Sequence, residues 1–254
     1  MAGGASLLDV RDLTLRFGGI TALGGVALSV AEGETVAVIG PNGSGKTSLF
    51  NCITGLYRPT SGSVAFRGES LLGLSPDRVT SRGVARTFQN LRLFIHMTVL
   101  DNLLLGRHLH FKKNLLSAAL RLRGEEVRHR EKCEEIIEFL DLAAWRDTRV
   151  GGCAFGVQKR VELGRALATE PALLLLDEPV SGLTSEEKDE VAYWIHEIGG
   201  RFKVTVLLVE HDLRVAARLA GRMIVLDRGL KLTEGTPEEV QRHPGVVRAY
   251  LGDQ

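Results

Sequence analysis

The stretch of sequence that decides the fold is Gly40-Pro41-Asn42-Gly43-Ser44-Gly45-Lys46-Thr47. It matches G-x-x-x-x-G-K-[ST], the pattern of a P-loop. Glycines let backbone N–H groups close around a polyphosphate, Lys46 supplies a positive charge for the β- and γ-phosphates, and the Thr47 hydroxyl can bind Mg2+. The sequence therefore predicts a binding site for a nucleoside triphosphate.

The residues on either side of this loop also fit a P-loop, which connects a buried strand to a helix. Residues 34–39 form a short, apolar, β-branched run that indicates the strand. Residues 47–54 place apolar side chains at helical spacing and are followed by Gly55. We therefore expect an α/β fold around the loop rather than a flexible glycine-rich segment.

The composition is that of an ordinary globular chain. Its 254 residues are 44% hydrophobic, which is enough for a sizeable core. The 32 basic and 31 acidic residues nearly cancel, giving a net charge of +1. Nothing in the overall charge therefore favours nucleic acid as a partner, and we expect none.

Two kinds of signal bear on the location of the chain. The first residues lack the charged and apolar regions of a signal peptide, and no window reaches the about 18 apolar residues of a spanning helix. Cys52, Cys133 and Cys153 lack C-x-x-C spacing, which favours free thiols in a reducing compartment. We expect a cytosolic chain that can dock on a membrane protein.

The N-terminal part of the chain has the pattern of antiparallel strands. Residues 8–32 alternate apolar and polar positions, with glycine pairs at 18–19 and 24–25 as turn signals. A further strand is expected at residues 63–67, after a turn at 59–62. These strands predict an antiparallel β subdomain around the helix that follows the P-loop.

The middle of the chain, from about residue 91 to 145, changes to helical periodicity. Its apolar face is formed by Cys133, Ile136, Ile137 and Leu140. We interpret residues 92–165 as a helical subdomain inserted in the α/β core, within a single domain that spans residues 1–254.

A basic stretch lies within this helical region. It consists of Arg107, Lys112, Lys113, Arg121, Arg123, Arg128, Arg130 and Lys132. We favour a solvated helix face for these side chains over a surface that contacts anionic lipid headgroups or a partner protein.

The C-terminal half alternates between apolar runs and helical segments. The runs at residues 172–176 and 204–209 are uncharged and are separated by a helical pattern. Such strands indicate a mainly parallel sheet that is covered on both faces. Residues 222–227 and 231–235 are expected to be closing strands, followed by a short helix from Pro237.

Polar side chains follow the buried strands of this sheet, where open parallel sheets bind ligands. The P-loop follows the first strand, Asp177 and Glu178 follow the second, and His211 follows the third. We expect Asp177 to hold Mg2+, directly or through water, and Glu178 to orient or deprotonate an attacking water. The alternative for this Asp-Glu pair is an acidic turn after a strand.

Taken in order, these motifs resemble those of the ATP-binding cassette ATPases, the motor subunits of ABC transporters, over nearly the whole chain. The resemblance implies that ATP and Mg2+ are the ligands, that residues 40–47 are the Walker A loop, and that residues 173–178 are the Walker B strand. It further implies that Glu178 is the catalytic carboxylate and that His211 senses the γ-phosphate.

The resemblance also assigns residues that the pattern of the sheet does not single out. Gln89 becomes the Q-loop glutamine, which acts in catalysis and binds the metal together with Thr47 and Asp177. Ser48 joins the residues that contact the nucleotide. Phe17 becomes the aromatic side chain that stacks on adenine, although a phenylalanine in a strand can equally be a core residue.

The signature loop of the family, approximately Leu-Ser-Gly-Gly-Gln, binds the γ-phosphate of ATP held by the other subunit. Here the corresponding residues are Ala154-Phe155-Gly156-Val157. Ala154 replaces the usual serine and removes a hydroxyl donor, whereas the Gly156 N–H and the helix N-terminus still offer an anion site. Thr184 stands where aspartate is common, which brings the communication between subunits into question.

Within the family, residues 86–90, 209–212 and 247–252 and the basic insertion resemble the ATPases of branched-chain amino-acid importers. The resemblance implies an ATP-hydrolysing subunit on the cytoplasmic face of the inner or plasma membrane. Its partners would be a second ABC ATPase subunit, identical or different, and membrane permease subunits whose conformation it changes. We expect the segment from about Gln89 to Leu105 to contact the permease.

Several alternatives stay open. The chain can be the low-turnover, nucleotide-gated regulatory half of an asymmetric pair, as Ala154 and Thr184 would favour. It can also serve an importer of urea, amides or other organic solutes, or a lipopolysaccharide-export system. A soluble ABC ATPase acting on DNA or ribosomes usually has two cassettes or long coiled-coil insertions, which disfavours that class here.

Overall fold

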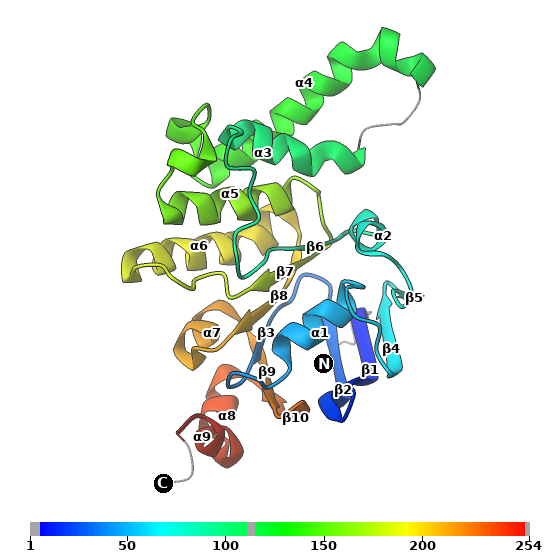
Figure 1. Cartoon of the computed structure of the whole chain (residues 1–254). Coiled ribbons are helices and arrows are strands. Elements are labelled where there is room, and N and C mark those ends of the chain that lie inside the picture. Colours follow the sequence, from blue (N-terminus) through cyan, green and yellow to red (C-terminus); the bar gives the residue numbers. More distant parts are fainter. Residues whose placement is uncertain (1–5, 111–114, 252–254) are drawn as a thin grey trace.

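The computed structural model describes residues 6–110 and 115–251 and contains two β-sheets with helices around them (Figure 1). The larger sheet has the strand order β10-β9-β3-β8-β7-β6, in which the β10–β9 pair is antiparallel and the other pairs are parallel. Its strands are β3 (Thr35–Ile39), β6 (Val84–Arg86), β7 (Leu173–Asp177), β8 (Thr205–Glu210), β9 (Arg222–Asp227) and β10 (Leu230–Gly235). The mainly parallel sheet expected from the sequence is confirmed.

The smaller sheet is antiparallel and has the order β2-β1-β4-β5, as the alternation near the N-terminus predicts. Its strands are β1 (Ser6–Phe17), β2 (Ile20–Ala31), β4 (Ser61–Phe66) and β5 (Glu69–Ser70). Strand β4 begins two residues before the expected position and includes Gly62. A Cβ at Gly62 would lie 2.5 Å from the Asp12 carbonyl oxygen, so this glycine permits close pairing with β1 where the sequence suggested a turn.

The core has two parts, one on each face of the larger sheet. Along β3, Val36 and Val38 pack toward the antiparallel sheet, whereas Ala37 and Ile39 pack toward the helices on the opposite face. This alternation follows from the period of two in a strand. Both faces are therefore covered, one by helices and the other by helix α1 (Lys46–Ile53) and the smaller sheet.

Most of the helices lie between or after the strands of the larger sheet (Figure 1). After α1 they are α2 (Pro76–Ser81), α3 (Val99–Gly106), α4 (Leu115–Phe139), α5 (Phe155–Leu167), α6 (Ser185–Phe202), α7 (Leu213–Leu219), α8 (Pro237–Arg242) and α9 (Pro244–Leu251). Short 3-10 helices are η1 (Arg107–His110), η2 (Ala143–Trp145) and η3 (Val150–Gly152).

Helices α3, α4 and α5 form the helical region between β6 and β7, at the top of Figure 1. The predicted apolar face is buried in the core, in agreement with the sequence; it consists of Cys133, Ile136 and Ile137 on α4 and of Leu140 directly after this helix. Residues 91–97, which the periodicity placed in a helix, have no helical structure, and the first helix begins at Val99.

The basic stretch is only partly a solvated face. Arg128, Arg130 and Lys132 are exposed, as expected. Arg107 contradicts the expectation, because its side chain is buried, donates to the Ala168 carbonyl at 3.0 Å and pairs with Glu170 at 3.0 Å. Lys112 and Lys113, and the side chains of Arg121 and Arg123, lie outside the described residues.

The three cysteines are buried free thiols, in agreement with the sequence. Burial raises the pKa of Cys52 to about 11 and that of Cys133 to about 11, so neither is a reactive thiolate near neutral pH. Among the helices within residues 6–110 and 115–251, none combines the length and the apolar composition that a membrane crossing requires.

Candidate functional site

The P-loop lies between β3 and α1 and packs tightly against neighbouring strands. Gly40 and Gly45 have positive φ angles of 152° and 104°, which side chains rarely adopt. A Cβ at Gly45 would lie 2.7 Å from the Ala22 carbonyl oxygen, and one at Gly40 would clash with the Leu226 carbonyl oxygen. The sequence needs glycine at both positions because the loop closes against backbone.

Lys46 points back into the P-loop. Its Nζ donates to the carbonyl oxygens of Gly40, at 2.7 Å, and Pro41, at 3.0 Å, and its side chain is buried. Burial lowers the pKa of Lys46, while the carboxylates of Glu178, Asp177 and Glu210 act in the opposite direction. The ammonium group is therefore held at the centre of the loop, where a bound phosphate would compete with the carbonyl groups.

The other residues of the loop leave its outer side open. Asn42, Gly43 and Thr47 are exposed, Ser48 is partly exposed, and Ser44 is buried. The backbone of the first turn of α1 and the Thr47 hydroxyl are thus accessible to a ligand, as the motif predicts.

The ends of two adjacent strands bring the predicted catalytic residues together. Strand β7 ends at Asp177 and pairs in parallel with β8, which ends at Glu210. Glu178 then adopts a left-handed conformation, with φ of 48°, and donates its backbone N–H to the Val209 carbonyl at 3.0 Å. This conformation is costly for a residue with a side chain, and it occurs directly after the last residue of β7.

The carboxylate of Glu178 contacts both His211 and Gln89. Its side chain is 14% exposed, and His211 Nδ1 lies 3.6 Å from its Oε1. Gln89 Nε2 donates to its Oε2 at 3.0 Å. The structure therefore brings together three residues that are far apart in the sequence and that were each predicted to act in catalysis.

Glu210 was not selected from the sequence, although a carboxylate at the end of an apolar strand is a visible signal. It is 1% exposed, and within the described residues its Oε1 has no hydrogen-bond partner. Burial raises the pKa of Glu210 to about 7, helped by Glu178 and Asp212 and opposed by the backbone groups of Val180 and His211. A titratable group is therefore buried beside His211, with its Oε2 3.9 Å from Nδ1 of the imidazole.

Replacing Glu210 by glutamine should flatten the pH dependence of stability. Because burial raises the pKa of Glu210 from 4.5 to about 7, the folded chain holds a proton in this window that the unfolded chain has lost. Its contribution to stability is therefore present below pH 4.5 and is lost as the pH rises to about 7. At higher pH the variant should be more stable than the wild type by about 1–3 kcal/mol.

Urea unfolding of both chains at about pH 4 and about pH 8 measures this difference. The advantage of the Glu210→Gln variant should appear at the higher pH and be nearly absent at the lower one. An equal effect at both values would show that folding does not change the protonation of Glu210, and so that burial does not raise its pKa.

Phe17, at the end of β1, is 48% exposed, so the interpretation of this residue as a core side chain is wrong. Its ring packs edge-to-face against Tyr57, with 5.3 Å between the ring centroids. One face of the ring can therefore take part in stacking on an aromatic base.

The signature-loop residues lie at the start of α5. Ala154 is the N-cap of this helix and makes no side-chain capping bond, as expected for alanine. Ala154 and Phe155 are exposed, whereas Gly156 and Val157 are buried. Among the described residues, no hydrogen bond or ion pair joins these four residues to the P-loop of the same chain.

Comparison with known proteins decides the family. A family model described as ABC transporter matches residues 23–181. BraF of Pseudomonas aeruginosa, a high-affinity branched-chain amino acid transport ATP-binding protein, is 40% identical over 250 residues, which cover 97% of this chain and 98% of BraF. The chain belongs to the ABC transporter family. It is accordingly a nucleotide-binding ATPase.

Two solved structures and a second family model extend the comparison. MJ1267, an ATP-binding cassette of an ABC transporter in its ADP conformation, is 31% identical with a TM-score of 0.85, covering 98% of this chain and 99% of MJ1267. A dimeric, post-hydrolysis structure of MJ0796 with ADP and Pi is 28% identical with a TM-score of 0.77, covering 91% and 98%. A model described as branched-chain amino acid ATP-binding cassette transporter matches residues 231–254.

Thr184 has a structural role in this ABC ATPase. It is the N-cap of α6, and its hydroxyl accepts from the Glu187 N–H at 3.3 Å while the Glu187 carboxylate accepts from the Thr184 N–H at 2.9 Å. This reciprocal pair is a capping box. Threonine and aspartate both serve as N-caps, which accounts for the departure from the family pattern without loss of the helix end.

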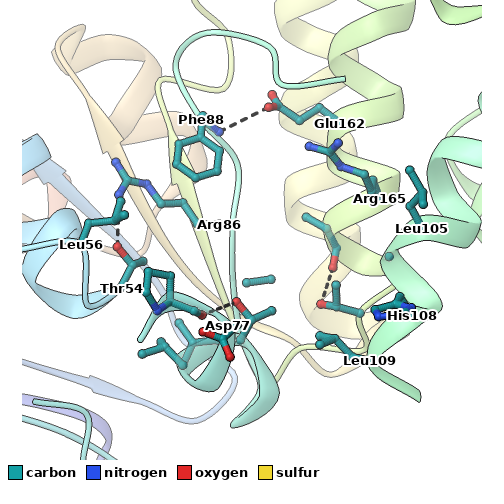
Figure 2. Close-up of a pocket in the computed structure, with 18 of the residues that line it drawn as sticks. Thr54, Leu56, Asp77, Arg86, Phe88, Leu105, His108, Leu109, Glu162 and Arg165 are labelled. Carbon is teal, nitrogen blue, oxygen red and sulfur yellow. Dashed lines mark hydrogen bonds between the residues drawn. The ribbon is translucent and has the colours of Figure 1, made fainter. Parts of the chain in front are cut away.

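A groove of about 400 Å³ separates the nucleotide-binding core of the ABC ATPase from its helical region (Figure 2). Thr54 and Leu56 lie on one side, Leu105, His108 and Leu109 on the other. Its charged groups include Glu162, Arg165, Asp77 and Arg86. The groove was not predicted, because its walls come from segments that the sequence separates.

Burial raises the pKa of Glu162, and the Lys159 ammonium opposes this change. Glu162 Oε1 accepts a long hydrogen bond of 3.4 Å from the Phe88 N–H, drawn in Figure 2. The carboxylate therefore ties α5 to the residue that precedes Gln89. The groove and the candidate catalytic site meet along this short segment.

A buried ion pair, also missed from the sequence, lies beneath the site. Arg86 Nη2 donates to Asp177 Oδ2 at 2.7 Å, and the two side chains are 6% and 5% exposed. The available signal was an arginine at the end of a strand, three residues before Gln89. Asp177 is thus the buried partner of a resident arginine and is not an exposed acidic turn.

Proposed function

We propose that this chain is the ATP-hydrolysing motor subunit of an importer for branched-chain amino acids. The observation that carries the proposal is the contact of Gln89 and His211 with the single carboxylate of Glu178, at the strand ends beside the P-loop. The similarity to BraF over the full chain and the match of residues 231–254 support the choice of solute.

The P-loop and Lys46 bind the phosphates of ATP, and Phe17 stacks on the adenine. Glu178 orients the attacking water or takes its proton, while Gln89 and His211 fix the direction of its carboxylate. His211 also responds to the γ-phosphate, because its imidazole is half-exposed and so accessible to a ligand.

Thr47, Asp177 and Gln89 would hold Mg2+. These donors are a hydroxyl, a carboxylate and an amide oxygen, and Mg2+ prefers oxygen ligands, commonly one or two carboxylates completed by phosphates and water. The described residues contain no cluster of three acidic, histidine or cysteine side chains that could hold a metal alone, which fits a metal brought with the nucleotide. When bound, Mg2+ neutralises charge on the phosphates.

The site needs a second subunit for completion. Residues 154–157 would approach the γ-phosphate of ATP held by a partner cassette, through the Gly156 N–H and the N-terminus of α5. The dimeric structure of MJ0796 with ADP and Pi supports such a pair. Closure of the pair on two ATP molecules, and its reopening after hydrolysis, would move the permease.

The permease would dock in the groove between the nucleotide-binding core and the helical region. Phe88, Phe94 and Leu105, which belong to or adjoin the segment expected to contact it, line this groove. Phe94 and Leu105 are large apolar side chains that remain exposed. We propose residues 92–165 as the helical subdomain that carries one wall, and a peripheral location on the cytoplasmic face of the membrane.

A second candidate function is a low-turnover regulatory half of an asymmetric pair. Ala154 favours it, because the N-cap of α5 has no hydroxyl to offer to a phosphate. In that case the Walker residues of this chain would be completed by the intact signature loop of a different cassette. Unequal turnover at the two sites of the assembled pair would support this alternative, and equal turnover would contradict it.

Uptake measurements in cells that naturally encode this chain test the proposed function. Deleting the gene should lower the uptake of radiolabelled leucine, isoleucine and valine, and the wild-type gene should restore it. The Glu178→Gln variant should not restore uptake, because the subunit would bind ATP without turnover. Unchanged uptake of all three amino acids, with loss of uptake of another solute, would contradict the choice of solute.

A further inference from the structure

Arg86 joins two parts of the nucleotide site that come from different elements. From the end of β6, its Nη2 donates to Asp177 Oδ2 on β7 at 2.7 Å, and its Nη1 donates to Asn51 Oδ1 on α1 at 2.7 Å. A longer bond of 3.3 Å to Thr54 Oγ1, drawn in Figure 2, adds a second contact with the C-terminal end of α1. One guanidinium thus ties the helix of the P-loop to the strand that carries Asp177.

The point of attachment on α1 is informative. Asn51 follows Thr47 by four residues, so the two side chains lie on the same face of the helix, one turn apart. The metal would be held by Thr47 and Asp177, and Arg86 bridges Asn51 and the same Asp177. The guanidinium therefore contacts Asp177 and, on α1, the residue one helical turn beyond Thr47.

The guanidinium is held in one orientation by aromatic rings. Its central carbon lies 5.4 Å from the Phe50 ring centroid and 5.1 Å from the Phe88 ring centroid. Within the described residues, the buried Nε hydrogen has no acceptor, so the hydrogen bonds come from the two terminal nitrogens. Lysine cannot reproduce this arrangement, since a single ammonium lacks the planar fork and its stacking.

We propose that Arg86 is a positioning residue for the metal site, which holds the Asp177 carboxylate in register with the face of α1 that carries Thr47. The guanidinium donates to one oxygen of the Asp177 carboxylate, Oδ2, and this hydrogen bond fixes the direction of the other oxygen. This role of Arg86 rests on the proposed function in one respect: it requires that Thr47 and Asp177 bind the Mg2+ that accompanies ATP.

The alternative is that Arg86 only neutralises a buried carboxylate. Charge and geometry can be separated, because a cation beside the site repels Mg2+ whereas correct orientation of Asp177 favours it. An Arg86→Met change removes both the repulsion of Mg2+ and the orientation of Asp177. Because these two effects on Mg2+ affinity oppose each other, this variant cannot separate them. The Arg86→Lys change keeps the charge and removes the fork, so it isolates the positioning effect.

The test compares the affinity for ATP with Mg2+ and with EDTA, by calorimetry on the full chain. The measured quantity is the ratio of the ATP affinity with Mg2+ to that with EDTA. For Arg86→Lys this ratio should fall by about 10–100-fold, as it does for other residues that orient a metal ligand. The affinity with EDTA should change little. Arg82→Lys is the matched control, because Arg82 is an exposed residue of the same segment paired with Glu69. It should leave both affinities unchanged.

A second variant keeps the inference testable if Arg86→Lys fails to fold. Asn51→Ala removes only the α1 end of the bridge and leaves Asp177 paired, so it should lower the Mg2+-dependent gain in the same direction by a smaller factor. With Mn2+ in place of Mg2+, the electron paramagnetic resonance spectrum of the ATP complex should change in both variants, which a purely structural role would not cause.

An Mg2+-dependent gain within about twofold of wild type in both variants would overturn the inference. An equal loss of affinity with and without Mg2+ would also overturn it, since that result indicates a general disturbance of the site. In either case wild-type binding of ATP with Mg2+ would leave the proposed function intact. A wild-type chain that binds no ATP would instead overturn the proposed function, and this inference with it.

Discussion

Replacing Glu178 by glutamine should slow ATP hydrolysis by about 10²–10⁴-fold, the range typical for the loss of a general base. The affinity for ATP should stay close to that of the wild type, because Glu178 does not belong to the P-loop. Glutamine has nearly the same shape and keeps an oxygen that can accept from Gln89 Nε2, so the geometry survives while the basic carboxylate is lost. Steady-state hydrolysis and ATP titration measure the two effects separately.

Glu186→Gln is a matched control for this change, since Glu186 is an exposed carboxylate in the first turn of α6. It removes the same charge and should leave hydrolysis unchanged. If the Glu178→Gln variant hydrolysed ATP at nearly the wild-type rate, the assignment of Glu178 as the catalytic carboxylate would be wrong. If it lost ATP binding as well, the carboxylate would serve the loop structure and not the reaction.

Replacing Lys46 by methionine should weaken ATP binding by about 10–150-fold, which corresponds to the loss of one charged hydrogen bond of about 1.5–3 kcal/mol. Hydrolysis should fall with it. Methionine fills a similar volume but cannot contact the β- and γ-phosphates. The loop itself should persist, because the change also removes an ammonium whose burial lowers its pKa and therefore opposes the charged form.

The melting temperature of the Lys46→Met variant without nucleotide checks that the fold is intact. Lys188→Met is the matched control, because Lys188 is partly exposed on α6, away from the P-loop. It should bind ATP like the wild type. Unchanged affinity in the Lys46→Met variant would refute the phosphate-binding role of the loop.

Much of the fold could be predicted because its signals are local. The apolar period of β3, the glycines of the P-loop and the helical spacing of α1 all lie within residues 34–54, and the structure places each element there. The same holds for β7 and β8, where uncharged runs end in polar residues. Propensity, pattern and turn chemistry agree in these segments.

The contacts within the site could not be predicted from local signals. Arg86 and Asp177 are 91 residues apart, and Gln89 and Glu178 are 89 apart; the parallel pairing of β6 with β7 brings both pairs together. The buried Glu210 shows the same limit, because an acidic residue at a strand end reads as exposed until the neighbouring elements are placed. Arg107 was misjudged for this reason, since its partners His129, Ala168 and Glu170 lie 22 to 63 residues further along the chain.

The central claim is that two cassettes complete each ATP site of this ATPase, and the dependence of hydrolysis on protein concentration tests it most directly. The rate of Mg2+-dependent ATP hydrolysis per chain should rise with the concentration of the purified protein and level off when the pair is formed. Size-exclusion chromatography of the Glu178→Gln variant should show a dimer in ATP and a monomer without it. A rate per chain that is constant at all concentrations, with a monomer in ATP, would contradict the claim.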